Sequence, residues 1–177
     1  MANKFWADSR LEPKRQHRWL LFIGAGTKKD DNLPAYVIKK VDKPKITVNP
    51  TEHKFFGHSF FYPGHVTWDS TSVTLVDPVA PDASGILWKA IRAAGYDPPT
   101  DRTGDAPHTM SKAKATNHLG LIKIQQMGPD NKPLETWKLF NPWILDVSWG
   151  TLDYSSDEMV ELTITFRYDY ATYKQGG

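Results

Sequence analysis

Near its C-terminus the chain alternates apolar and polar residues from Met159 to Tyr170, and this run limits its fold more than any other feature. Successive side chains on a β-strand point to opposite faces, so the alternation predicts one long strand. Its predicted core face carries Val160, Leu162, Ile164, Phe166, Tyr168 and Tyr170. Its predicted polar face carries Glu161, Thr163, Thr165, Arg167 and Asp169.

A strand of this length cannot be stable by itself. At roughly 3.3 Å per residue it reaches about 40 Å, whereas a globular strand usually has about 5–6 residues. Burial of its core face contributes on the order of 10 kcal/mol, and ordering its backbone costs a similar amount. The strand therefore needs neighbours along its whole length, from its own chain or from other subunits. We expect copies of the chain to supply them.

The composition is typical of a globular protein. With 177 residues, of which 40% are hydrophobic and 24% charged, the chain can bury a core as one domain. We place this domain at 17–177 and interpret the polar residues 1–16 as an N-terminal arm. A net charge of +2 is too small to indicate nucleic-acid binding. The lack of cysteine excludes disulfides and fits an intracellular origin, and we expect neither a secretory signal nor a membrane span.

The rest of the sequence predicts several short strands and a single helix. Capping residues and helical spacing place the helix at 82–94. Pro63-Gly64 predicts a turn, and the segments 119–127 and 134–140 predict a hairpin. Residues 96–117 contain little to bury and predict a long mobile loop. The fold class is therefore mainly β: a β-sandwich or partly closed barrel with one flanking α-helix.

No motif in the sequence indicates catalysis. Gly24-Ala25-Gly26 has Lys29 where a dinucleotide fingerprint needs its third glycine. The six histidines are scattered, and none belongs to a zinc-binding HExxH pair. Asp153, Asp157 and Glu158 lie in a probable turn, where acidic residues are common. We therefore predict a protein that is not an enzyme and binds no metal ion or cofactor.

Three motifs in the last third of the chain carry a family resemblance. They are W-K-L-F-N-P-W at 137–143, L-D-Y at 152–154, and the alternating run that contains F-R-Y-D at 166–169. In this order they resemble the C-terminal signature of the tail tube proteins of contractile-tailed bacteriophages. The resemblance extends over about residues 17–174. The arm, the basic stretch from Lys39 to Lys45 and the long 96–117 segment depart from the family pattern.

The resemblance implies a structural role. Six protomers would form a ring, their sheets would join into a continuous inner β-barrel, and the rings would stack into a hollow tube. Such a tube lies inside a contractile sheath, binds baseplate and tail terminator proteins, and conducts double-stranded DNA without binding it specifically. The protein would be assembled in the host cytoplasm and reside in the virion tail.

Within such a tube, the polar face of the terminal strand would line the lumen or face solvent. Its balanced charge suits a wall that must not hold DNA. The segments 42–60 and 96–117 are expected to contact the adjacent ring. The candidate inter-ring residues are Lys43, Lys45, Asp101, Arg102, Lys112 and Lys114.

Two other functions are compatible with this sequence. One is a tube initiator in a baseplate, or the inner tube of a related contractile secretion system, because these would share the ring-forming fold. The other is a carbohydrate-binding or hydrolytic β-domain, which would need exposed coplanar tryptophans. Trp137, Trp143 and Trp149 lie instead at strand positions suited to core or subunit packing.

Overall fold

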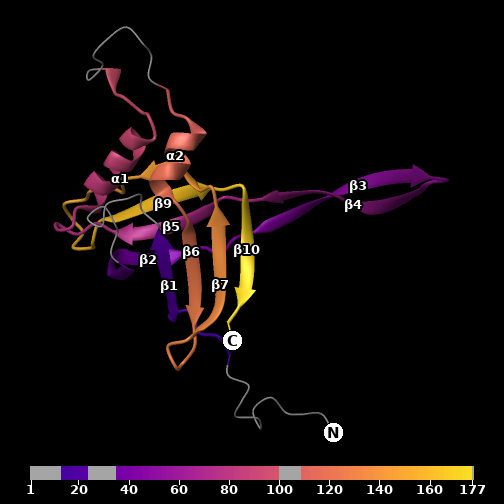
Figure 1. The fold of residues 1–177 in the computed structure, drawn as a ribbon, viewed down its shortest axis with the longest axis horizontal. Coiled ribbons are helices and arrows are strands. Elements are labelled where there is room, and N and C mark those ends of the chain that lie inside the picture. The colour runs from indigo at the N-terminus through magenta and orange to yellow at the C-terminus, as the bar shows by residue number, and fades with distance from the viewer. Residues whose placement is uncertain (1–12, 24–34, 100–108, 177) are drawn as a thin grey trace.

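The computed structural model describes residues 13–23, 35–99 and 109–176, and this part of the chain is mainly β (Figure 1). The strands are β1 (Trp19–Ile23), β2 (Ile38–Val41), β3 (Ile46–Phe55), β4 (His58–Trp68), β5 (Thr71–Val76), β6 (Ile122–Met127), β7 (Pro133–Phe140), β8 (Trp143–Ser148), β9 (Glu161–Arg167) and β10 (Tyr170–Gln175). The helices are α1 (Ala83–Ala93) and α2 (Lys112–Leu119), and a 3₁₀ turn (Ala35–Val37) precedes β2.

The strands form two four-stranded antiparallel sheets and one separate hairpin. The first sheet has the order β1-β6-β7-β10 and the second has the order β2-β5-β9-β8. Figure 1 shows that the strands of the two sheets cross, as in a sandwich with orthogonal packing. Strands β3 and β4 pair only with each other and project away from the sandwich (Figure 1). The predicted class, a mainly β sandwich, is confirmed.

The core lies between the two sheets and is built by period-2 alternation. In β9, Leu162, Ile164 and Phe166 are buried while the residues between them are half-buried. The facing strands contribute in the same way, and the buried set includes Leu21, Val73, Leu75, Ile122, Ile124 and Leu139. Full burial of each such side chain contributes about 1.5–3 kcal/mol.

The terminal run is two strands rather than one, which corrects the sequence prediction. β9 ends at Arg167 and belongs to the second sheet, whereas β10 begins at Tyr170 and belongs to the first. Between them the Asp169 N–H donates to the Phe140 carbonyl at 3.1 Å, and this bond fixes the crossing. Tyr168 is still buried, but Tyr170 is 46% exposed. The crossing breaks the alternation, so Tyr170 does not belong to the predicted core face.

We expected copies of the chain to supply the strands that pair with the terminal run, and for β9 this prediction was wrong. β9 pairs with β5 on one side and with β8 on the other, so its own chain supplies both partners. β10 differs, because it pairs with β7 and is the last strand of its sheet. β9 therefore needs no strand from another subunit.

Two local predictions need correction. The 96–117 segment is not all loop, since α2 begins at Lys112 after Ser111, whose Oγ accepts from the Lys114 N–H at 3.3 Å. Its short length and few apolar residues hid it in the sequence, so two helices flank the sheets instead of one. The predicted turn at Pro63-Gly64 lies inside β4; the hairpin turns at Phe56 and Gly57, both with positive φ.

Candidate assembly surfaces

The β3–β4 hairpin pairs with no other strand among the described residues and carries many exposed apolar side chains. Nearly every residue of both strands is exposed. Its exposed large apolar side chains are Ile46, Val48, Phe55, Phe56, Phe60, Phe61, Tyr62 and Val66. A two-stranded hairpin is marginally stable in water, and exposed apolar patches of this kind mark interaction sites. The hairpin is therefore suited to packing against another protein surface.

Two phenylalanines are the most exposed large apolar side chains of the hairpin. Phe56 is 86% exposed and Phe61 is 67% exposed. Phe55 and Phe56 pack edge to face with ring centroids 4.2 Å apart. Such an aromatic pair presents a large rigid apolar surface, as anchors of protein interfaces do.

Each four-stranded sheet also ends in open edges. The outer strands are β1 and β10 in the first sheet, and β2 and β8 in the second. Because each sheet has an even number of antiparallel strands, its two outer strands run in opposite directions. An edge of one copy can therefore pair with the opposite edge of the next copy and continue the antiparallel pattern.

The predicted polar strip lies on the outer face of the second sheet. In register with β9, Thr163 lies opposite Thr74, and Thr165 lies opposite Ser72. Glu161 forms an ion pair with Lys39. Arg167 is half-buried at the end of β9. The two central strands therefore present small hydroxyl side chains on this face, flanked by Lys40 on β2 opposite Thr74 and by Asp146 on β8 opposite Thr165.

Asp169, the last residue of the predicted strip, has left the sheet. Its carboxylate accepts from Lys112 Nζ at 2.6 Å and from Asn141 Nδ2 at 2.8 Å. These two hydrogen bonds, the one from Lys112 first, lower the pKa of Asp169 below its ordinary value. Asp169 thus joins α2 to the crossing between β9 and β10 and does not extend the polar face.

The predicted inter-ring residues are not brought together. Lys43 pairs with Glu135, whereas Lys45 pairs with Asp69 at 3.0 Å. Lys112 binds Asp169 on the other side of the molecule, and Lys114 is exposed on α2. Asp101 and Arg102 lie outside the described residues. Three of the predicted contacts are therefore engaged in ion pairs within the chain.

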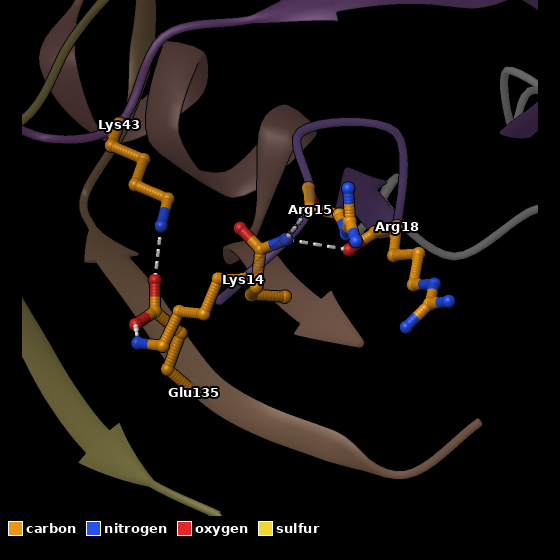
Figure 2. Close-up of polar contacts among 6 residues, drawn as sticks. Lys14, Arg15, Arg18, Lys43 and Glu135 are labelled. Carbon is orange, nitrogen blue, oxygen red and sulfur yellow. Dashed lines mark hydrogen bonds and ion pairs between the residues drawn. The ribbon is translucent and has the colours of Figure 1, made fainter. Parts of the chain in front are cut away.

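Sequence reasoning missed a buried polar cluster at the end of the first sheet (Figure 2). The Glu135 carboxylate, with a side chain only 6% exposed, accepts from both Lys14 and Lys43. Beside it, Gln126 Nε2 donates to the carbonyl oxygens of Arg15 at 2.6 Å and Arg18 at 2.8 Å. We call Gln126 and Glu135 the polar clamp. It holds residues 14–18 and the segment that leads into β3.

The polar clamp leaves a faint signal in the sequence. Gln126 and Glu135 occupy the inward positions of an otherwise apolar alternation in β6 and β7. A buried charge needs paired hydrogen-bonding partners, but those partners are distant in sequence. Their identity could not be inferred without the fold.

Among the described residues, no group of three or more His, Cys, Asp or Glu side chains is placed to hold a metal ion. No helix within these residues is long and apolar enough to cross a membrane.

Comparison with known proteins relates this fold to contractile injection machines. No protein-family model and no curated protein sequence matches the chain. Among solved structures, a chain of the anti-feeding prophage tube terminating cap superposes with a TM-score of 0.68 at 16% identity, over 99% of both chains. A chain of the 6-fold symmetrised baseplate of the same particle gives 0.65 at 15% identity, over 93% of this chain and 97% of that one.

A chain in the sheath–tube complex of the extracellular contractile injection system PVC also gives 0.65 at 15% identity, over 93% of both chains. At such identities the likeness shows the fold alone. The chain thus has the fold found in tube-bearing contractile particles, as its sequence resemblance implied.

Proposed function

We propose that this protein is a structural protomer whose copies form rings that stack into the inner tube of a contractile injection machine. One observation carries the proposal: among the described residues the β3–β4 hairpin pairs with no other strand, and it exposes eight large apolar side chains. A surface of this kind requires a partner. A second copy of the chain can supply this partner. Because every protomer carries the same hairpin, the contact can be repeated from copy to copy.

The comparisons support the kind of assembly. The matching chains belong to a baseplate, a sheath–tube complex and a tube terminating cap. One of these structures has 6-fold symmetry, which supports a ring of six. In such a ring each open sheet edge would pair with the opposite edge of its neighbour, and closure would remove the exposed edges.

Within the ring we assign the channel wall to the outer face of the second sheet. Ser72, Thr74, Thr163 and Thr165 give this face a centre of short, uncharged hydroxyl side chains. A polyanion gains no ion pairs there, so cargo can slide past. The sequence left this strip facing either the lumen or solvent, and we assign it to the lumen, except for Asp169.

The hairpin is then the contact between successive rings. It projects beyond the sandwich (Figure 1), and it contains most of the 42–60 segment for which the sequence suggested this role. In its finer form the proposal places the tube in a phage tail, inside a contractile sheath, where the cargo is the genome. The extracellular injection system among the similar structures supports an alternative tube that delivers another cargo.

A second candidate role is a ring at one end of the tube. The match to the tube terminating cap, which covers 99% of both chains, favours it. A terminal ring would use the hairpin on one side only. Such a protein would form single rings or closed ring pairs rather than long tubes.

Negative-stain electron microscopy of the purified protein tests the proposal. A tube protomer should give rings and stacked tubes with a central channel, and a terminal protein should give rings alone. Sedimentation analysis of the same sample should report masses that are multiples of one ring. A protein that stays monomeric at high concentration, with its hairpin exposed, would contradict both roles.

A further inference from the structure

The outer face of the first sheet carries an unusual charge distribution. On β6 and β7 the residues that face away from the core include Lys123, Gln125, Thr136 and Lys138, and the Gln125 side chain donates to Thr136 at 3.2 Å. Lys174 of β10 lies on the same face, because it is in register with Thr136. We call the surface formed by Lys123, Lys138 and Lys174 the cationic face.

Two of these lysines form an unfavourable pair. Lys123 and Lys138 are direct cross-strand partners in the β6–β7 ladder, and like charges in this position destabilise a sheet. Both side chains are half-buried, so water screens them incompletely. No carboxylate on the face offsets the repulsion, because the outward positions of β1, β6, β7 and β10 carry no Asp or Glu.

Several lysines elsewhere in the described residues are paired with a carboxylate. Lys39, Lys45 and Lys112 each form such an ion pair. On the cationic face Lys123 instead forms a cation–π interaction, with its Nζ 4.1 Å from the Phe22 ring centroid. Local arrangements that cost stability without internal compensation are expected where a protein meets a partner.

We propose that the cationic face is a docking surface for a partner protein whose contacting surface carries carboxylates. Such a partner would supply carboxylates to the Lys123–Lys138 pair, for which the outward positions of this sheet carry none. This inference goes beyond ring formation, because ring closure would use the backbone of the edge strands β1 and β10 and ring stacking would use the hairpin, whereas docking would use the outward side chains of the first sheet, including Lys174 of β10.

The surroundings of the lysines favour a protein over a nucleic acid. Phe22 and Tyr170, both more than two-fifths exposed, lie at opposite margins of the face. Protein interfaces combine apolar contacts with charge pairs, whereas nucleic-acid interfaces are more polar and more strongly basic. A face with three lysines and two aromatic rings matches the first description.

Fluorescence anisotropy with a labelled peptide that alternates glutamate and leucine tests this assignment. The full-length protein is used in whichever oligomeric state it adopts, so the result does not depend on ring formation. The triple variant Lys123→Gln, Lys138→Gln, Lys174→Gln should weaken peptide binding about tenfold or more, because charge pairs with the peptide are lost. Salt should weaken binding to the wild-type protein more than binding to this variant.

A matched control distinguishes binding at the cationic face from an effect of the net charge of the protein. Lys89, Lys114 and Lys132 are exposed and lie off the face, so their triple replacement by glutamine changes the net charge equally. This control should change affinity by less than about twofold. An equal loss in the control would overturn the proposal, as would equal binding of a peptide with glutamine in place of glutamate. Tighter binding of duplex DNA through the same lysines would replace the protein partner with a nucleic acid.

Stability gives an independent readout. Lys138→Glu converts the repulsive pair into an attractive one, so it should raise the Tm by about 1–4 °C. The same substitution should abolish peptide binding. A surface selected for docking predicts this opposition between stability and binding. A variant that loses both, with normal circular dichroism, would show that Lys138 serves the fold and would overturn the proposal.

Discussion

Gln126 and Glu135 lie opposite each other in the β6–β7 ladder, and both side chains are buried. Gln126 binds the backbone of residues 15–18, while Glu135 binds Lys14 and Lys43. The polar clamp therefore joins two segments that are distant in sequence: residues 14–18, which precede β1, and the residues around Lys43, which lead into β3. The same pair of residues fixes both segments to the end of the first sheet.

Glu135 should make the stability of the protein sensitive to acid. Burial opposes ionisation of its carboxyl, but hydrogen bonds from Lys14 and Lys43 outweigh burial and lower its pKa from the ordinary value of 4.5. A group whose pKa is lowered by folding stabilises the native state above the unfolded pKa, and this stabilisation is lost as the pH falls through the folded pKa. The free energy of unfolding by urea should therefore decline below about pH 4.5.

The variant Glu135→Gln should lower the free energy of unfolding at pH 7 by about 1–3 kcal/mol, because it removes charge-assisted hydrogen bonds from a buried site. Its stability should also depend less on pH in the acid range. Glu161→Gln is the matched control, since it removes an exposed pair with Lys39 and should cost less than about 1 kcal/mol. Equal losses in both variants would show that the polar clamp has no special role.

Neighbouring residues on β9 should respond oppositely to the same substitution. Phe166 is 1% exposed, so Phe166→Asp buries an unpaired charge and should abolish folding. Thr165 lies on the half-buried hydroxyl face, and Thr165→Asp should leave the fold intact. Circular dichroism and thermal unfolding of both variants provide the measurement. Asp146 lies opposite Thr165 on β8, so like-charge repulsion should lower the stability of Thr165→Asp by up to about 1 kcal/mol. Complete loss of the fold would mean that the outer face of the second sheet is covered within the protomer.

Aromatic residues of the hairpin should control assembly without affecting the protomer. Phe56 has a φ of 47°, a conformation that asparagine tolerates, so the double variant Phe56→Asn, Phe61→Ser should keep the native circular dichroism. Loss of these apolar contacts should reduce the assembled fraction in sedimentation by about tenfold or more. The control Lys54→Ala changes an exposed polar residue of the same hairpin. If the aromatic variant assembled as well as the wild-type protein, the hairpin would not form the contact between rings.

The sequence determined the faces of strands better than their ends. Alternation in the terminal run correctly separated Leu162, Ile164 and Phe166 from the threonines between them. It could not reveal the break after Arg167, because Tyr168 and Tyr170 continue the pattern although the chain changes sheets. That break depends on hydrogen bonds to residues 140 and 141, which are local in space and distant in sequence.

The other differences between the sequence predictions and the structure depend on contacts between segments that are distant in sequence. Gly64 lies in β4, with the ideal position of a Cβ atom 2.6 Å from the Asn49 carbonyl, so this glycine serves a close strand approach rather than a turn. The hairpin was not predicted because most of β3 after Val48 is polar and because Pro63-Gly64 suggested a turn inside what is β4. Its expected contact with another subunit did not depend on these strand boundaries.

The segment 96–117 gives the last prediction. The end of α1 and the start of α2 are adjacent, because the Ser111 N–H donates to the Ala94 carbonyl at 3.3 Å. Gly95 approaches Thr109 so closely that a Cβ atom would lie 2.8 Å from its carbonyl oxygen. The stretch from Gly95 to Pro99 reaches at most about 14 Å, which a Gly-Ser linker of about five residues can span. Replacing residues 100–108 with that linker should therefore preserve folding.

If this segment contacts the adjacent ring, the shortened protein should form folded rings that stack poorly. Tube lengths in negative-stain images measure stacking, and circular dichroism verifies the fold. A linker of nine Gly and Ser residues in the same place is the control for length, since it keeps the chain span but removes the side chains. Poor stacking with both linkers would assign the contact to side chains of 100–108, whereas tubes of normal length with both would confine ring stacking to the hairpin.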